Sequence, residues 1–89
     1  MKVDAAAIKK VIQERKTVIG REQVLRHLKR GKLESIYLTS NIDEHTKSMV
    51  EKYCSLSNVG VIHIPFNNQE LGTLCKKPFP VSILGVVKS

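Results

Sequence analysis

The amino-acid sequence predicts an α/β protein, a three-layer α/β/α sandwich built around a four-stranded mixed sheet. Segments with helical spacing of apolar residues alternate with short β-branched runs along the whole chain, an order typical of sheets covered by helices. The expected strands are nearly continuous apolar runs, as strands buried on both faces require. The 89 residues suffice for one core but not for two, so we expect residues 1–89 to form a single domain.

The chain begins with an amphipathic helix and a short strand. From Val3 to Lys16, apolar residues recur at helical spacing with polar residues between them. The run Thr17–Ile19 is β-branched and is stopped by Gly20, so it indicates a short strand.

The second helix is expected over Arg21–Arg30, with Gly31 as its C-terminal stop. One side is apolar, and the opposite side is polar and mostly cationic: Glu22, Gln23, Arg26, Lys29 and Arg30. Because Gly20 precedes the helix, the first backbone N–H groups are unshielded and can approach a phosphate. The alternative is an ordinary solvated helix face on which Glu22 and Arg26 pair at i, i+4.

A buried strand and a third helix follow. Ser35–Thr39 is the uninterrupted run of a central strand. Asn41 stands three residues before Glu44, the spacing of an N-cap with a capping-box acid, although Asp43 could cap the helix instead. The core stripe expected on this helix is Met49, Val50, Tyr53 and Cys54.

Another strand and a short fourth helix come next. Val59–Ile64 is the strand, and Pro65 closes it. Asn67 and Glu70 repeat the cap-and-acid pattern at the start of the helix. The apolar side of the helix is Leu71, Leu74 and Cys75.

The segment Lys76–Pro80 is expected to be a loop, because two prolines this close together cannot continue a helix. Val81–Val87 is then the last strand. Phe79 stands on this loop between prolines and after two lysines, a setting suited to stacking on an exposed base. A Phe that plugs the edge of the sheet is the alternative.

The positive charge is concentrated in the first third of the chain. The sequence has 15 Lys and Arg residues against 8 Asp and Glu residues, a net charge of +7. Residues 1–32 hold ten basic and three acidic residues, whereas residues 33–89 hold five of each. A charge this uneven favours a polyanionic partner such as nucleic acid over a solvated surface that only keeps the protein soluble.

Several classes of protein are excluded by the pattern. No apolar run approaches the roughly 20 residues of a membrane span, and no signal or transit peptide is recognisable, so we expect a cytoplasmic protein without a membrane partner. Cys54 and Cys75 belong to no Cys-x-x-Cys pair and no His cluster, which argues against zinc and thiol redox chemistry. Both are interpreted as reduced thiols on buried helix faces.

An enzyme is not expected either. His27, His45 and His63 are dispersed, and no Ser, Cys or carboxylate stands at a supporting distance along the chain. We interpret His63, which falls inside a strand, as a core or sheet-face residue. Gly20 and Gly72 are isolated, so there is no Gly-rich phosphate loop. We therefore expect no metal, no cofactor and no small-molecule substrate.

Three segments taken together resemble a known family. They are Gly20–Arg26 with Arg30–Lys32, then Ile36–Asn41, and then Glu70–Cys75 followed by Phe79 and Val81. In this order and spacing they resemble the ribosomal proteins L-thirty-e and L-seven-Ae and their relatives, over nearly the whole chain. The resemblance implies the same sandwich fold and a protein that binds RNA. Many members bind kink-turns, which are sharply bent internal loops with tandem sheared G·A pairs.

The resemblance also implies where RNA is contacted: the start of the second helix, the end of the following strand and the loop before the last strand. With the cationic helix face, the candidate RNA-binding residues are Gly20, Arg21, Glu22, Gln23, Arg26, Lys29, Arg30, Ser40, Asn41, Lys76, Lys77, Pro78 and Phe79. Gly20 and Gln23 are implied near bases, Arg26 on phosphate where relatives usually carry Lys, and Asn41 at a base or backbone edge. Phe79 is implied near a splayed nucleotide.

Two positions depart from the family's pattern. Glu22 stands where relatives usually carry Asn or Lys, and a carboxylate there repels phosphate and cannot make the same base contact. Lys76 replaces a frequent Gly after the cysteine. Both departures bear on kink-turn specificity more than on RNA binding through charge and shape.

The leading hypothesis is an RNA-binding protein of the large ribosomal subunit, cytoplasmic and ribosome-associated, which contacts structured rRNA and neighbouring subunits of the particle. The alternative is a protein-interaction module of the same fold that acts in translation or stress response without binding RNA. The RNA hypothesis requires Arg26, Asn41 and Phe79 to share one rim of the molecule.

Overall fold

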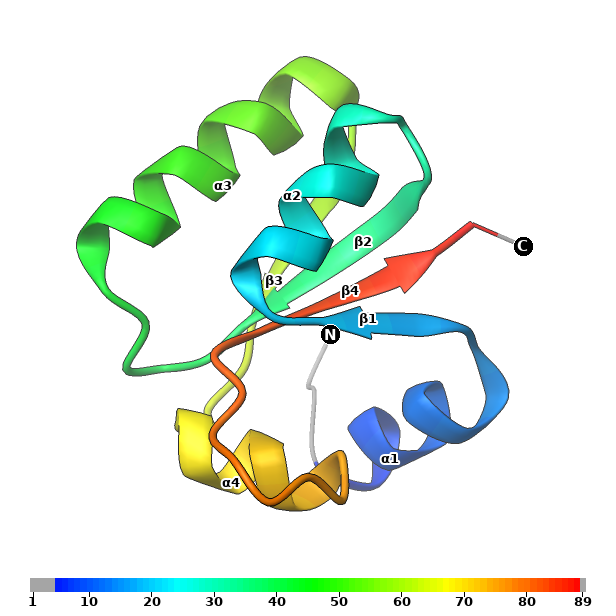
Figure 1. Ribbon diagram of the computed structural model, residues 1–89, viewed down its shortest axis with the longest axis vertical. Helices are drawn as coiled ribbons and strands as arrows, with labels where there is room; N and C mark the ends of the chain where they lie inside the picture. Colours follow the sequence, from blue (N-terminus) through cyan, green and yellow to red (C-terminus); the bar gives the residue numbers. More distant parts are fainter. Residues whose placement is uncertain (1–4, 89) are drawn as a thin grey trace.

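The computed structural model describes residues 5–88 and has four helices that alternate with four strands (Figure 1). The elements are α1 (Ala5–Glu14), β1 (Thr17–Ile19), α2 (Arg21–Lys29), β2 (Leu33–Leu38), α3 (Glu44–Ser57), β3 (Gly60–His63), α4 (Asn68–Leu74) and β4 (Ile83–Val87). Every expected helix and strand is present. The expected start of the first helix at Val3 lies outside the described residues.

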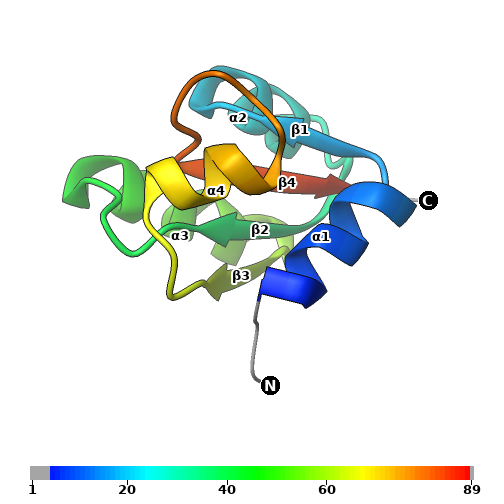
Figure 2. The ribbon, with the colours of Figure 1, turned by 90° about the horizontal axis from the view of Figure 1, so that it is seen from below.

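The strands form one mixed sheet in the order β1-β4-β2-β3. β2 and β3 are parallel, whereas β4 pairs antiparallel with both β1 and β2. Figure 2 shows α1 and α4 on one face of the sheet and α2 and α3 on the other. The expected three-layer sandwich with a four-stranded mixed sheet is confirmed.

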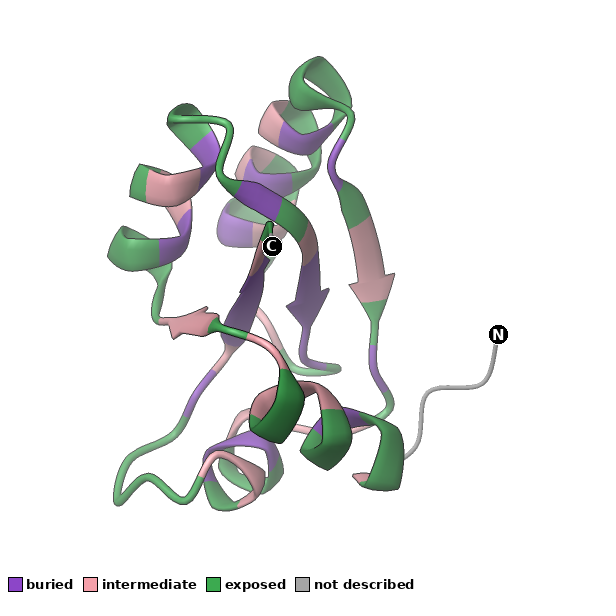
Figure 3. Ribbon diagram, turned by 90° about the vertical axis from the view of Figure 1, so that its right-hand side faces the viewer, coloured by how far each residue is buried: buried purple, intermediate pink, exposed green. Residues whose placement is uncertain are grey.

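The core lies in two layers because side chains of a strand alternate between its faces. In β4, Ile83 packs with the buried residues of α2 and α3, whereas Leu84 and Val86 pack with those of α1 and α4. Each helix turns a narrow apolar side to the sheet, such as Val24 and Leu28 on α2, and leaves its outer side exposed (Figure 3). This arrangement explains why the two central strands, β2 and β4, are apolar over most of their length.

Two strand boundaries differ by two residues from those predicted, and the ends of β2 and β3 differ by one. β2 begins at Leu33 rather than Ser35, and β4 begins at Ile83 rather than Val81. Before β4, the backbone of Val81 donates to the Asn68 carbonyl, and the carbonyl of Ser82 accepts from the backbone of Thr39. These two residues therefore tie the loop to neighbouring segments before the regular ladder begins.

The helix caps decide between the alternatives left open. Asp43 caps α3, since its carboxylate accepts from the backbone N–H and the hydroxyl of Thr46, both at 2.9 Å. The prediction of Asn41 as the N-cap is therefore wrong. The capping box of α4 is confirmed: Asn67 accepts from the Glu70 amide, and the Glu70 carboxylate accepts from the Asn67 amide.

Two expectations about single residues need correction. Cys54 is buried on α3, but Cys75 is the residue that follows α4 and is only half-buried, because the chain turns there into the loop. Of the two alternatives for His63, the core residue is wrong and the sheet-face residue is observed. His63 ends the edge strand β3, is exposed, and lies 3.4 Å from a Glu51 carboxylate oxygen on α3. A different element supplies that partner, so spacing along the sequence does not reveal it.

Candidate nucleic-acid interface

Three loops meet at one end of the sheet, where β1 and β2 end and β4 begins (Figure 1). They are the β1–α2 junction, the segment between β2 and α3, and the loop between α4 and β4. Residues from all three line an open hollow of about 460 Å³: Ile19, Gly20, Arg21, Asp43, Thr46, Phe79, Pro80, Val81 and Ser82. We call this end of the molecule the rim.

The start of α2 forms one wall of the hollow. Gly20 has φ +90°, a conformation that side-chain-bearing residues rarely adopt, and it supplies no side chain to cap the helix. Its backbone N–H donates to the Ile83 carbonyl at 3.3 Å, which fixes the junction beside β4. The uncapped helix N-terminus and the exposed guanidinium of Arg21 are both suited to an anion.

Asp43 brings a negative charge to the same hollow. The hydrogen bonds from the Thr46 backbone and hydroxyl lower the pKa of this carboxyl, and the nearby Arg21 charge adds to the effect. The group is therefore ionised at neutral pH. A carboxylate repels phosphate but accepts hydrogen bonds from base amino groups, so Asp43 favours a base edge over a phosphate at its position.

Asn41 lies beside the hollow and is held by α4. Its amide donates to the Asn68 side-chain oxygen at 2.9 Å, and its own oxygen accepts from the Asn68 backbone N–H at 2.9 Å. Ser40 is tied to the same region, because its backbone N–H donates to the Phe66 carbonyl at 2.8 Å. The end of β2 is thus fixed to the start of α4.

The loop between α4 and β4 forms the opposite wall and packs directly on α4. A methyl group added at Gly72 would lie 2.4 Å from the Phe79 carbonyl oxygen, so only glycine allows this approach. The loop leaves Phe79 51% exposed. A Phe that plugs the edge of the sheet is therefore not observed, and stacking on a base stays a prediction.

The candidate residues fall into groups by position. Gly20, Arg21 and Phe79 line the hollow, while Ser40 and Asn41 lie next to it through their bonds to the α4 region. Glu22, Gln23 and Arg26 are exposed on α2, with Arg26 about 7.5 Å further along the helix axis than Arg21. Lys77 and Pro78 line a shallow depression that shares Phe79 and Pro80 with the hollow.

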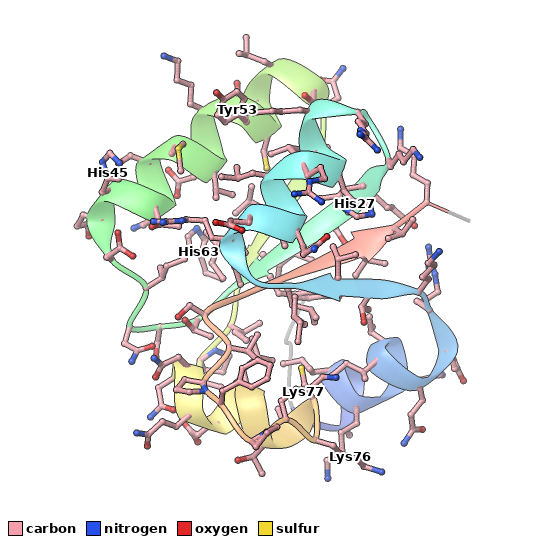
Figure 4. The ribbon with its side chains drawn as sticks, in the orientation of Figure 1. His27, His45, Tyr53, His63, Lys76 and Lys77 are labelled. Carbon is pink, nitrogen blue, oxygen red and sulfur yellow. The ribbon has the colours of Figure 1, made fainter. Side chains whose placement is uncertain are left out.

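Besides Glu22, Gln23 and Arg26, three further candidates stay away from the hollow. Lys29 and Arg30 stand at the other end of α2, and the Lys29 ammonium lies 5.6 Å from the centre of the Tyr53 ring on α3. Lys76 lines a separate depression between α1 and α4, and its φ of +58° lies in the left-handed region that favours glycine. Figure 4 shows Tyr53 on α3, on the opposite face of the sheet from Lys76 and Lys77.

Sequence reasoning misses several residues of the rim. The sequence pattern indicates Asp43 only as a cap, yet this residue also lines the hollow. Asn68 carries no sequence signal, because its partner Asn41 is 27 residues away. Gly72 is noted in the sequence only as part of the Glu70–Cys75 segment that resembles the family. An isolated glycine inside a helical pattern is the signal that could indicate a close backbone approach.

The histidines do not form a site. His27, His45 and His63 come from α2, α3 and β3 and do not converge (Figure 4). His27 contacts the Gln23 carbonyl within its own helix at 2.8 Å. Within residues 5–88, no three His, Cys, Asp or Glu side chains are placed to share a metal ion, and no helix is long and apolar enough to cross a membrane.

Comparison with protein families and curated sequences gives a consistent result. Residues 4–89 match the ribosomal protein L7Ae/L30e/S12e/Gadd45 family. The chain is 31% identical over 80 residues to large ribosomal subunit protein eL30 of Sulfurisphaera tokodaii, covering 90% of this chain and 76% of that protein. It is 38% identical over 76 residues to the protein of the same name from Branchiostoma belcheri, covering 85% and 67%.

Solved structures share the fold. A Bacillus halodurans protein described as having unknown function superposes with a TM-score of 0.83 at 22% identity, covering 96% of this chain and 84% of its own. The Giardia lamblia 15.5kD RNA binding protein superposes with a TM-score of 0.78 at 19% identity, covering 92% and 68%. At these identities the likeness concerns the arrangement of the elements.

Proposed function

Since this chain belongs to the ribosomal protein L7Ae/L30e/S12e/Gadd45 family, we propose that it is an RNA-binding protein of the large ribosomal subunit. Curated relatives at 31% and 38% identity carry the name of a large-subunit protein. The resemblance seen in the sequence leads to the same family. The protein would act in the cytoplasm as part of the ribosome, with no catalytic role.

The observation that carries the proposal is the convergence at the rim. Segments separated by up to about 60 positions along the chain place a bare helix N-terminus, an arginine and an exposed aromatic around one hollow. These three features fit a phosphate, a second phosphate and an unstacked base. Proteins that recognise RNA specifically bind such splayed bases in loops and bulges.

The chemistry of each side chain indicates which part of the RNA it contacts. Arg21 and Arg26 hold the phosphate backbone, which positions the RNA without reading its sequence. Phe79 stacks on an extruded base, and Asp43 accepts hydrogen bonds from a base edge inside the hollow. Asn41, fixed by Asn68, offers its remaining amide hydrogen to the RNA. The preferred ligand is a bent internal loop of the kink-turn type.

Two RNAs test the proposal. One has a bent internal loop with tandem sheared G·A pairs, and the other has the same helices with the G·A pairs replaced by Watson–Crick pairs. Phe79→Ala is expected to weaken binding of the bent RNA alone, by about 5- to 150-fold, since stacking of one base contributes about 1–3 kcal/mol. Asn41→Ala is expected to act on the bent RNA as well. Arg26→Ala should weaken binding of both RNAs alike. It should also make the slope of log K against log salt concentration shallower by about 0.7–0.9, the contribution of one phosphate contact.

Leu56→Ala is the matched control, because Leu56 is another exposed apolar residue, 75% accessible at the end of α3. It should leave both affinities unchanged. The unfolding midpoint of Asn41→Ala must be measured alongside, because that change removes two hydrogen bonds to Asn68. Equal, small effects of Arg26→Ala, Asn41→Ala and Phe79→Ala on both RNAs would contradict the assigned rim. No measurable affinity for either RNA would favour the protein-interaction module instead.

A further inference from the structure

A second group of cations lies at the end of the sheet opposite the rim. Lys16 precedes β1, Lys32 precedes β2, and Lys88 follows β4. The Lys16 carbonyl accepts from the Val87 amide at 2.9 Å, and the Lys32 carbonyl accepts from the Lys88 amide at 2.8 Å. The backbones of these three lysines therefore stand side by side, with neighbouring strands about 4.8 Å apart. Arg30, the C-cap of α2, comes two positions before Lys32.

We call Lys16, Arg30, Lys32 and Lys88 the far basic end. All four are exposed, and Figure 3 looks onto this end of the molecule. The closest acids along the described chain are Glu34, which forms an ion pair with Arg15, and Glu14 at the end of α1. The C-terminal dipole of α2 also favours cations at Arg30. The four positive charges of the far basic end therefore have few acidic side chains near them to neutralise them.

The far basic end is electrostatically separate from the rim. Both ends are joined by β2, whose six residues span about 20 Å. The Debye length at physiological ionic strength is about 8 Å, so charges at one end are screened from a ligand at the other. A ligand seated in the hollow at the start of α2 is therefore largely screened from Arg30, although the sequence places Arg30 on the same cationic helix face.

We propose that the far basic end is a second RNA contact, which binds the phosphate backbone of another RNA segment while the rim holds the first. This inference rests on the proposed function. The four side chains carry charge and no aromatic ring, so this surface holds phosphates without reading a base. The protein then joins two RNA segments at opposite ends of one sheet.

A two-RNA capture experiment tests the proposal. The bent internal-loop RNA is immobilised and loaded with the full protein, unbound protein is washed away, and a labelled RNA duplex of about 16 base pairs is added. Wild-type protein is expected to retain the duplex, with an affinity that falls steeply as salt rises. The triple variant Lys16→Gln, Lys32→Gln and Lys88→Gln should weaken duplex capture by about tenfold or more, while it loads on the immobilised RNA as the wild type does.

A matched triple variant, Lys9→Gln, Lys10→Gln and Lys52→Gln, removes the same charge from exposed positions on α1 and α3 and should still capture the duplex. Both triple variants keep the backbone bonds of the sheet, and equal melting temperatures check that they fold. Capture that is absent in the wild type, or lost equally in both variants, overturns the second contact and leaves the proposed function standing. Failure of the wild type to load on the first RNA overturns the proposed function itself.

Discussion

At the scale of the residue, Gly72 determines where the aromatic loop lies. The loop backbone at Phe79 and Pro80 approaches the α4 backbone so closely that an added methyl group would meet the Phe79 oxygen at 2.4 Å and the Pro80 Cα at 3.3 Å. Both obstacles are backbone atoms, so no side-chain rotation relieves them. The position of Phe79 beside Gly20 and Arg21 therefore depends on the absence of a side chain at residue 72.

The change Gly72→Ala is expected to lower the free energy of unfolding by about 1–3 kcal/mol, the usual cost of overpacking. It should also weaken binding of the bent RNA as Phe79→Ala does, because the loop must move away from α4. Urea unfolding measures the first effect and RNA titration the second. Gly60→Ala is the control, since its methyl group would meet only the Ser35 Cβ at 3.9 Å and should cost less than about 0.5 kcal/mol. Equal stability of Gly72→Ala and the wild type would contradict the close approach.

At the scale of the element, the capping residues of α3 and α4 form part of the rim. Asp43 caps α3 and lines the hollow, and Asn41 bonds the first amide of α4 from the end of β2. Helix starts leave backbone N–H groups unpaired, and these polar side chains satisfy them. The same side chains then stand where an RNA would enter, so the stability of the two helices and the shape of the rim are linked.

The cap of α3 makes stability depend on pH in a defined direction. Hydrogen bonds from Thr46 lower the pKa of Asp43 in the folded protein below its unfolded value. The ionised cap therefore stabilises the fold above the unfolded pKa, and this contribution is lost as pH falls through the lowered, folded pKa. We expect Asp43→Ala to be less stable than the wild type at pH 7, and the gap to narrow below about pH 4.

Asp43→Asn is the comparison for that experiment, because asparagine caps helices well without a charge. Its stability at pH 7 should exceed that of Asp43→Ala, and the difference between these two variants should not change with pH. Chemical unfolding at pH 7, 5 and 3 measures all three proteins. A gap between wild type and Asp43→Ala that widens toward acid would contradict the assigned cap.

At the scale of the whole molecule, the sheet keeps its two faces and its two ends apart. Cys54 belongs to the core formed with α2 and α3, whereas Cys75 packs with the core of α1 and α4. The sheet lies between them, and a disulfide requires Cα atoms within about 7 Å. The same separation along the strands divides the rim from the far basic end.

The thiols are therefore expected to stay unpaired when the folded protein meets a mild oxidant. Burial raises the pKa of both Cys54 and Cys75, which reduces the reactive thiolate. A thiol-reactive dye should label Cys75 first, because Cys75 is half-buried and Cys54 is buried. Mass spectrometry after oxidation in buffer and in urea checks the pairing. An intramolecular disulfide formed in the folded protein would contradict the placement of the two residues.

Much of the fold could be predicted because its signals are local. The helical spacing of α2, the Asn67 and Glu70 capping box and the two prolines of the 76–80 loop each act within a few residues. The predicted boundaries are less accurate where contacts outside the element decide them. Val81 and Ser82 look like strand residues but bond to Asn68 and Thr39 instead.

By itself, the sequence determined the order of the elements and the family, since periodicity, caps and motifs depend on residues close together along the chain. It located the buried side of α3 only in part, because Val50 and Cys54 are buried as expected, whereas Met49 is half-buried and Thr46 is buried instead. Only the tertiary structure decided which cations share a surface. Lys29 and Arg30 lie on the helix that begins with Arg21, yet the rise of α2 carries them to the other end of the sheet, where Arg30 joins Lys16, Lys32 and Lys88. Strand pairing brings those lysines together from positions far apart, and no local pattern encodes which strands pair.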